Sequence, residues 1–262
     1  MEKLIILENL TKKYGDKCVL DHISWDFFKG ESVAFTGHNG SGKSTLLKLM
    51  AGLITKSSGN VIYHGKLRMG YVPEKFPGMD ITMNRYLKCI AGMEGINPKI
   101  ADELMRDFFL ESMKDVSMKD LSKGSLQKVG VIQALMTPAD VLLFDEPLSG
   151  QDAESQEVFI RKSNELRDKG VTVFMSCHEK RLVEELCDKE YVIDNGILNE
   201  KRGDGENPVR ILIEKNIALS PRADMKDTGS RYLLYVDRKD LKENVLRLYS
   251  EGWEISGIEE CI

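Results

Sequence analysis

The chain has 262 residues, a formal net charge of −5 and no dominant basic block. This length suits one large domain, or one domain with a small appendage, and it is enough to bury a full core. The acidic balance argues against a general nucleic-acid binder, so we expect no nucleic-acid partner.

Cysteine usage and hydropathy indicate where the protein works. The cysteines are scattered without a C-x-x-C pair, which is typical of reduced thiols in a cytosolic protein. No apolar run approaches the roughly 20 residues that cross a bilayer. Residues 1–8 are too short and too acidic for a signal peptide. We therefore expect a cytoplasmic protein that acts at a membrane only through a partner.

Residues 1–36 alternate apolar and polar side chains, with turns at residues 14–16 and 29–31. This pattern predicts antiparallel strands, and residues 60–65 add another short strand. Tyr14 stands between lysines and a glycine and is expected to be exposed. It could stack on an adenine ring or be an ordinary edge-strand tyrosine, and its neighbours favour neither.

The segment Gly37–Thr45 has the spacing G-x-x-x-x-G-K-[ST] of a phosphate-binding loop. An apolar strand at residues 32–36 precedes it, and a helix that ends near Gly52 follows. This order aims backbone N–H groups and the positive end of the helix dipole at one point, where a polyphosphate fits. Lys43 can reach the terminal phosphates and the Ser44 hydroxyl can bind Mg²⁺. A glycine-rich turn that binds nothing is the alternative, and the strand and helix on either side of the segment argue against it.

The chain then changes from strands to helices. Residues 69–74 read as an apolar strand that ends in a proline and Glu74, and helical patterns follow to about Gly130. Thr82 is expected to cap one helix, which ends at Gly95, and residues 97–98 to open another. The apolar face of this insertion indicates internal packing more than a docking surface.

Acidic residues and a histidine follow two predicted strands. Residues 141–144 predict a buried parallel strand, with Asp145 and Glu146 at its end, where ligands bind in open α/β sheets. The first acid suits Mg²⁺ and the second can polarise an attacking water. His178 follows the next strand, at residues 171–176. A lone histidine is more often structural, but its place at the same edge favours a catalytic role.

Ser122 lies in a small-residue turn before a helix, where it could be an ordinary N-cap or part of a second anion site.

From about residue 203 the chain forms a tail that is separate from the preceding domain. Residues 202–208 read as a linker, and short strands and a helix follow. This tail predicts a small α+β appendage without a catalytic cluster.

Residues 1 to about 200 resemble the nucleotide-binding subunit of an ATP-binding cassette (ABC) transporter. The resemblance rests on motifs in the family order: the phosphate loop, the signature turn at residues 121–125, the strand and acids at residues 141–146, the dimer-crossing loop at residues 149–152, and His178. The phosphate loop alone is shared with kinases and GTPases. The signature between a helical insertion and the paired acids is specific to this family.

The resemblance implies an α/β fold of the P-loop NTPase class. Its RecA-like core would carry an antiparallel β subdomain and a helical insertion at about residues 76–130. The cassette would comprise residues 1–202 and the C-terminal α+β extension residues 203–262.

The resemblance also implies a role for each motif residue. The residues expected to catalyse ATP hydrolysis are Glu146, His178 and Lys43. Those expected to bind Mg²⁺ are Ser44, Glu74 and Asp145. The residues expected to contact ATP are Tyr14, Gly37, His38, Asn39, Gly40, Ser41, Gly42, Lys43, Ser44, Thr45, Ser122 and Gly124.

Each ATP would lie between the phosphate loop of one chain and the Ser122–Gly124 turn of a second copy or a paralogous cassette. Hydrolysis would open this dimer and drive a separate integral membrane permease, with the cassette bound to it on the inner face of the cell membrane. The signature variant and the short tail favour export.

The sequence departs from the family pattern at several positions. Glu74 stands where the family usually has Gln, Lys123 and Ser125 depart from Leu-Ser-Gly-Gly-Gln, and Gln151 replaces an apolar residue. Lys123 could tighten a closed dimer or point to solvent. None of these changes removes a group needed for hydrolysis.

Two other functions are possible in principle. Soluble cassette ATPases that act on ribosomes or DNA typically carry two cassettes or a long coiled coil, and this chain shows neither. A nucleotide-binding regulator without hydrolysis is disfavoured because the sequence retains Lys43, Asp145, Glu146 and His178.

Overall fold

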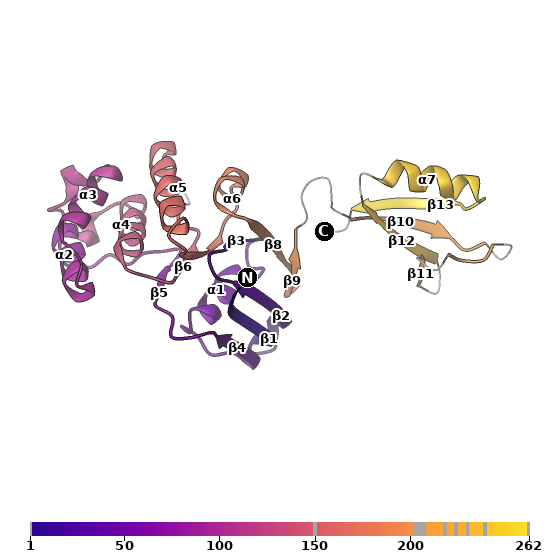
Figure 1. Cartoon of the computed structure of the whole chain (residues 1–262), viewed down its shortest axis with the longest axis horizontal. Coiled ribbons are helices and arrows are strands. Elements are labelled where there is room, and N and C mark those ends of the chain that lie inside the picture. The colour runs from indigo at the N-terminus through magenta and orange to yellow at the C-terminus, as the bar shows by residue number, and fades with distance from the viewer. Residues whose placement is uncertain are drawn as a thin grey trace. The chain divides into compact units, whose positions relative to one another are not determined.

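The computed structural model of the chain describes residues 2–148, 151–201, 208–216, 219–222, 225–228, 231–237 and 240–260. Its contacts divide the chain into two compact units, Met1–Glu200 and Lys201–Ile262 (Figure 1). The predicted boundary at residue 202 and most of the predicted linker lie outside the described residues, as do residues 149–150 of the dimer-crossing loop.

A six-stranded sheet with the strand order β5-β6-β7-β3-β8-β9 forms the centre of the first unit. Its strands, in that order, are Met69–Val72, Val141–Asp145, Thr172–Ser176, Ser32–Thr36, Lys189–Asp194 and Ile197–Glu200. Neighbouring strands are parallel except β8 and β9. Because parallel strands end at the same edge, the residues that follow β3, β5, β6 and β7 meet there.

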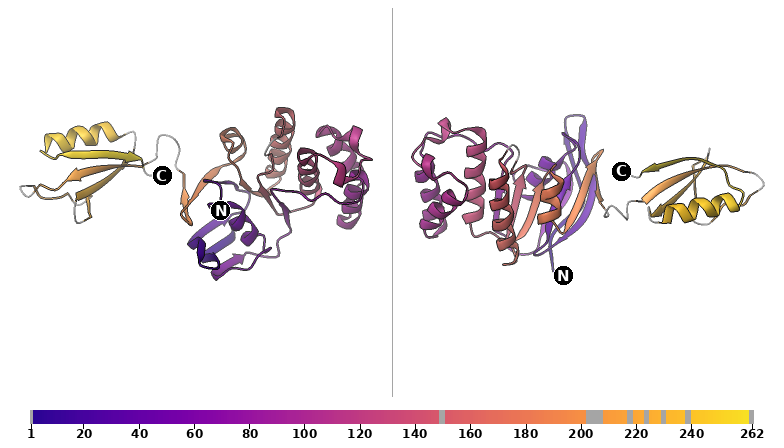
Figure 2. Two further views of the ribbon diagram at one scale, coloured as in Figure 1. Left: turned by 180° about the vertical axis from the view of Figure 1, so that it is seen from behind. Right: turned by 90° about the horizontal axis from the view of Figure 1, so that it is seen from above.

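The two faces of this sheet bury different apolar clusters. Along β6, Leu142 and Phe144 belong to one cluster, and Val141 and Leu143 belong to the other. The first cluster is covered by α4 (Lys123–Met136), α5 (Ala153–Arg167) and α6 (Lys180–Leu186). The second is covered by α1 (Lys43–Met50). Helices on both faces (Figure 2) explain why these strands read as continuous apolar runs.

A three-stranded antiparallel sheet, in the order β2-β1-β4, lies beside α1 (Figure 1). Its strands are β1 (Lys3–Tyr14), β2 (Lys17–Phe28) and β4 (Ser58–Tyr63). The ring centroid of Phe27 on β2 lies 5.1 Å from that of Phe174 on β7, so both sheets share one apolar cluster. This arrangement confirms the predicted antiparallel strands for β1, β2 and β4, whereas residues 32–36 form the parallel strand β3.

Between β5 and β6 the chain forms a helical insertion. It contains α2 (Met83–Glu94), α3 (Lys99–Asp107) and the start of α4. As predicted, the Thr82 side chain caps α2 by accepting a hydrogen bond from the N–H of Arg85, and Gly95 ends the helix. Helix α4 begins directly after the Ser122 turn, as predicted, and continues to Met136.

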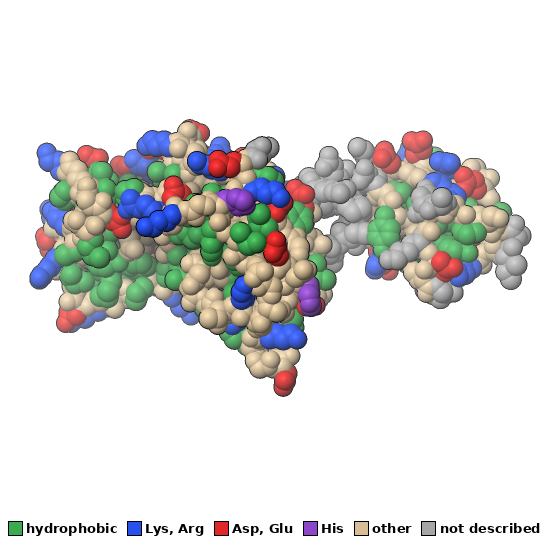
Figure 3. All heavy atoms as spheres, turned by 60° about the horizontal axis from the view of Figure 1, so that its bottom comes forward, with side chains coloured by type: hydrophobic (Ala, Val, Ile, Leu, Met, Phe, Trp, Pro, Cys, Tyr) green, Lys and Arg blue, Asp and Glu red, His purple; other side chains and the backbone are tan. Residues whose placement is uncertain are grey.

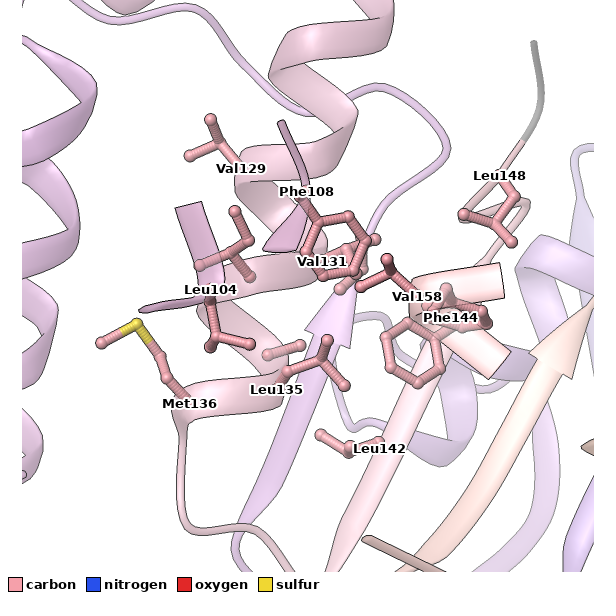
Figure 4. Packing of buried hydrophobic residues seen from close by; sticks show 14 of the residues in the cluster. Leu104, Phe108, Val129, Val131, Leu135, Met136, Leu142, Phe144, Leu148 and Val158 are labelled. Carbon is pink, nitrogen blue, oxygen red and sulfur yellow. The ribbon is translucent and has the colours of Figure 1, made fainter. Parts of the chain in front are cut away.

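The apolar face of the insertion packs mainly inside the unit. Leu104 and Phe108 are buried against α4 and the sheet (Figure 4), as the sequence predicts. Ile100, one helical turn before Leu104 on α3, is 37% exposed. The predicted internal packing therefore holds for most of this face.

The second unit is a four-stranded antiparallel sheet, in the order β11-β12-β10-β13, with helix α7. Its elements are β10 (Pro208–Glu214), β11 (Met225–Asp227), β12 (Arg231–Asp237), α7 (Leu241–Ser250) and β13 (Ile255–Glu260). Ile211, Ile213, Leu234, Leu248 and Trp253 form its core. The short strand β11 was missed from the sequence.

The surface gives no sign of a dominant basic patch on the face shown in Figure 3, where basic and acidic side chains are interspersed over the first unit. None of the helices in the described part of the chain is long and apolar enough to span a membrane.

Candidate active site

A cavity of about 540 Å³ opens at the carboxyl edge of the central sheet. The residues that line it come from the phosphate loop, the ends of β5, β6 and β7, and the start of β2. They are Val19, Asn39, Gly40, Gly42, Lys43, Ser44, Thr45, Glu74, Glu146 and His178. The fold therefore brings together the loop, both glutamates and the histidine, which are far apart in the sequence.

The phosphate loop requires glycine at two positions. Gly37 has φ 135° and Gly42 has φ 114°, in a region that L side chains rarely adopt. A Cβ on Gly37 would lie 2.5 Å from the carbonyl oxygen of Ile193, and one on Gly42 would lie 2.8 Å from a methyl carbon of Leu20. The loop can follow this path only with glycine at both positions, and it leads directly into the N-terminus of α1, where phosphate groups typically bind.

Lys43 extends over the loop that contains it. Its Nζ donates hydrogen bonds to the carbonyl oxygens of Gly37 at 2.9 Å and His38 at 3.4 Å, and lies 3.0 Å from Nε2 of His178. Burial lowers the pKa of this ammonium, although the carboxylate of Glu146 acts to raise it. A desolvated ammonium in this place favours an anionic ligand.

Asp145 is buried and accepts three hydrogen bonds. Its Oδ1 accepts from the hydroxyls of Ser44 and Ser176, each at 2.8 Å, and its Oδ2 accepts from the Tyr71 hydroxyl at 3.1 Å. Burial and the nearby Asp145 charge strongly raise the pKa of Tyr71, which keeps its hydroxyl a donor. The carboxylate is thereby fixed with one oxygen toward the phosphate loop.

Glu146 adopts a backbone conformation that is uncommon for a residue with a side chain, with φ 50°. Its carboxylate oxygen Oε1 lies 3.2 Å from Nε2 of His178. Burial raises the pKa of Glu146, while His178 and Lys43 act to lower it. Because one imidazole nitrogen faces both partners, His178 either accepts from Lys43 or donates to Glu146 at any moment.

The oxygen donors at this edge suit a magnesium ion. The hydroxyl of Ser44 and the carboxylate of Asp145 are in direct contact, and Glu74 lines the same cavity. Among the described residues, no group of three or more His, Cys, Asp and Glu side chains could hold a metal ion by itself. Magnesium typically binds to one or two carboxylates together with substrate phosphates, so the residues present fit this ion.

Some predicted ATP-binding residues lie outside the cavity lining. The carbonyl groups of Gly37 and His38 contact Lys43, and the buried Ser41 hydroxyl has no hydrogen-bond partner among the described residues. Tyr14, at the end of β1, is 52% exposed, with Lys12 Nζ 4.6 Å from its ring centroid. The structure thus confirms that Tyr14 is exposed, and its stacking on adenine stays a prediction.

The signature turn also lies outside this cavity. The Ser122 side chain caps α4 by accepting from the N–H of Ser125 at 3.1 Å, and its hydroxyl lies 2.9 Å from that of Ser125. Ser122 and Lys123 are exposed and Gly124 is partly exposed. The capping role is therefore present, and an anion-binding role for this turn stays a prediction.

Sequence reasoning missed the contacts that the signature turn and helix α4 make with the segment after β6. Gln151 Nε2 donates to the carbonyl oxygen of Gly124 at 2.8 Å, and Lys128 Nζ lies 2.9 Å from Asp152 Oδ2. It also missed Tyr71 and Ser176 beside Asp145. Ser176 pairs with Asp145 in the parallel register of β6 and β7, which a correct strand alignment could have revealed.

Comparisons with known proteins identify the family of this chain. Residues 20–149 match the family model of the ABC transporter. An uncharacterised ABC transporter ATP-binding protein of Methanocaldococcus jannaschii is 35% identical over 202 residues, which cover 75% of this chain and 76% of that protein. The zinc import ATP-binding protein ZnuC of Rickettsia conorii is 35% identical over 210 residues, covering 76% of this chain and 89% of that protein.

A more distant relative is the lantibiotic transport ATP-binding protein SrtF of Streptococcus pyogenes, 27% identical over 229 residues, which cover 84% of this chain and 100% of that protein. Among solved structures, an ATP-binding subunit of an ABC transporter superposes with a TM-score of 0.69 at 26% identity, over 77% of this chain and 90% of that chain. These similarities confirm the predicted cassette fold. The chain belongs to the ATP-binding proteins of ABC transporters and is an ATPase subunit of that family.

Proposed function

We propose that this chain hydrolyses Mg-ATP at the interface of a cassette dimer and thereby powers a separate membrane permease. The observation that carries the proposal is the meeting of Lys43, Glu146 and His178 around one cavity, with Asp145 and Ser44 in contact beside it. Each of these groups has a task in phosphoryl transfer.

The phosphate loop binds the polyphosphate of ATP. Backbone N–H groups at the start of α1 and the ammonium of Lys43 surround the terminal phosphates, and the contacts of Lys43 with Gly37 and His38 are exchanged for phosphate oxygens. Ser44, Asp145 and Glu74 hold Mg²⁺, which supplies positive charge for the phosphate oxygens when it is bound.

Glu146 orients the attacking water and accepts its proton. The raised pKa of this partly buried carboxylate makes it a stronger base than an exposed glutamate. His178, 3.2 Å from its Oε1, holds the carboxylate at the mouth of the cavity and contacts the γ-phosphate. Lys43 and the backbone amides stabilise the charge that develops on the transferred group.

A second copy, or a paralogous cassette, completes the site. Ser122 and Lys123 are exposed and stand outside the cavity of their own chain. The turn at residues 122–124 is therefore free to cover the γ-phosphate bound by a partner, with Lys123 adding a positive charge. ATP then holds two cassettes together, and hydrolysis releases them.

The permease is an integral membrane protein, and the cassette binds it on the cytoplasmic face of the membrane. The family and the absence of a spanning helix in the described part of the chain support this division of labour.

Of the relatives, one is a zinc import protein and another a lantibiotic transport protein. We retain export, which the signature variant and the short tail favour. Uptake of a labelled substrate into inverted vesicles that contain the permease would test this direction.

The proposal is tested by Glu146→Gln. This change keeps the shape of the side chain and removes the base, so we expect ATP binding to persist, turnover to stop and an ATP-dependent dimer to accumulate in size-exclusion chromatography. Glu165→Gln, at an exposed position on α5, is the control and should behave like the parent. Hydrolysis at the parental rate in Glu146→Gln would show that the base is elsewhere.

A further inference from the structure

The hydroxyl of Ser176 connects Asp145, the last residue of β6, with Glu146, which follows it. Ser176 is the last residue of β7 and its exposure is 0%. Its Oγ donates a hydrogen bond to Oδ1 of Asp145 at 2.8 Å and accepts one from the backbone N–H of Glu146 at 2.9 Å. One side chain therefore contacts the carboxylate of one residue and the backbone of the next.

The sheet holds this hydroxyl in place. The parallel register pairs Ser176 with Asp145 on one side and with Phe35 of β3 on the other. Because both neighbouring strands are buried, Ser176 cannot move without breaking the centre of the sheet. Its position relative to the ends of β3 and β6 is accordingly fixed by the fold.

The contact also explains how Glu146 keeps its unusual backbone. At φ 50° the chain turns sharply out of β6 and directs the carboxylate toward the cavity. The N–H of Glu146 is held by two acceptors on Ser176, the hydroxyl at 2.9 Å and the carbonyl oxygen at 3.2 Å. Strained conformations of this kind persist only where surrounding contacts over-determine them.

We propose that Ser176 is a positioning residue for ATP hydrolysis, which fixes the Asp145 carboxylate and the Glu146 backbone through one hydroxyl. Ser176 does not line the cavity, so it acts through these two residues and not on the nucleotide. The inference rests on the roles proposed above for Asp145 and Glu146. It predicts that loss of the hydroxyl slows the chemical step more than it weakens nucleotide binding.

The test compares three variants of the full chain with a matched control. Ser176→Ala removes the hydroxyl, Ser176→Cys fills the site with a weak donor, and Ser176→Thr keeps the hydroxyl. Ser163→Ala on α5 is the control, because Ser163 is 2% exposed and its hydroxyl has no hydrogen-bond partner among the described residues. Steady-state ATPase rates, ATP affinity in EDTA and thermal unfolding are measured for each protein.

We expect Ser176→Ala and Ser176→Cys to lower kcat by about tenfold or more, the effect of losing a hydrogen bond to a charged group. The Kd for ATP in EDTA should stay within about twofold of the parent, because the phosphate loop is untouched. Ser176→Thr should retain kcat within about threefold, and Ser163→Ala within about twofold.

Three results would overturn the inference: a kcat for Ser176→Ala or Ser176→Cys equal to that of Ser163→Ala, a kcat for Ser176→Thr as low as that of the Ala or Cys variant, or a loss of ATP affinity that accounts for the whole loss of rate. Glu146→Gln, assayed in parallel, separates this inference from the proposed function. If Glu146→Gln is inactive and the Ser176 variants are not, only the positioning role fails.

Discussion

Burial shifts the pKa values of the two oppositely charged residues in the cavity, Lys43 and Glu146, in opposite directions. It lowers the pKa of Lys43, although Glu146, Asp145 and Glu74 act to raise it. It raises the pKa of Glu146, although His178 and Lys43 act to lower it. Each charge is therefore partly desolvated and incompletely compensated inside the protein. A polyphosphate supplies Lys43 with the anionic partner that the protein alone provides only in part.

Asp152, at the start of α5, has a lowered pKa, in contrast to the raised pKa of Glu146. The hydrogen bond from Lys128 and that from the N–H of Ser155 hold the pKa of this carboxyl well below its usual range. A lowered pKa in the folded state stabilises the protein above the ordinary pKa of aspartate. That contribution is lost as the pH falls through the lowered folded-state pKa.

Asp152→Asn isolates this charge, because Asn caps a helix about as well as Asp. Since the Asp152 side chain is 55% exposed, we expect the free energy of unfolding at pH 7 to fall by only about 0.2–1 kcal/mol. Urea titrations should show this difference shrinking as the pH is lowered from about 5. Asp168→Asn at the other end of α5 is the control and should cause no such loss. A difference independent of pH would contradict the assignment to charge.

At the scale of elements, the active site was largely predictable because each motif is local in the sequence. The phosphate loop, the acids at the end of β6 and the histidine after β7 each lie in a short local segment, and parallel strands bring these segments to one edge of the sheet. The contacts of Tyr71 and Ser176 with Asp145 depend on register between strands far apart in the chain. Neither residue carries a local signal of its role, so both were missed.

The hydrogen bonds between α4 and the segment that follows β5 were also not predictable from local sequence. Gln127 accepts a hydrogen bond from the N–H of Phe76 and donates one to the carbonyl oxygen of Pro73, so it attaches the segment that follows β5 to α4. The ring of Phe76 lies against Gly130, where a Cβ would come within 2.4 Å of it. Periodicity predicts these helices, but it does not predict which residues of the segment contact them.

Gly130→Ala should therefore destabilise the protein, since overpacking typically costs about 1–3 kcal/mol and exceeds the gain in helix propensity. Gly92→Ala in α2 is the matched control, because a Cβ there meets nothing within 4 Å. It should stabilise the helix by up to about 1 kcal/mol. Thermal unfolding compares the Tm of the two variants. Equal shifts in Tm would show that the Phe76 ring moves aside without loss of stability.

At the scale of the molecule, each unit has its own core. The two apolar clusters of the first unit contain described residues up to Leu198, and the third cluster begins with Ile211. No described residue belongs to the core of both units. The stability of the first unit, and the cavity within it, should therefore not require the second unit.

A chain that ends after Glu200 tests this expectation. It should bind ATP within about twofold of the full chain and unfold within about 4 °C of the transition of the first unit in the parent. A chain that ends after Asp188 is the control: it lacks β8, whose Tyr191 and Ile193 are buried, and should not fold. Calorimetry and fluorescent-nucleotide binding report both properties, and an unfolded 1–200 chain would refute the independence of the units.

The position of β3 in the sheet has a consequence for protein synthesis. β3 ends at Thr36, yet its neighbours on either side are β7, which begins at Thr172, and β8, which begins at Lys189. A translating ribosome thus releases the nucleotide loop long before the strands that hold it in place. Until these strands emerge, the nascent chain cannot form the cavity, and ATP can assist folding only after nearly the whole cassette has been made.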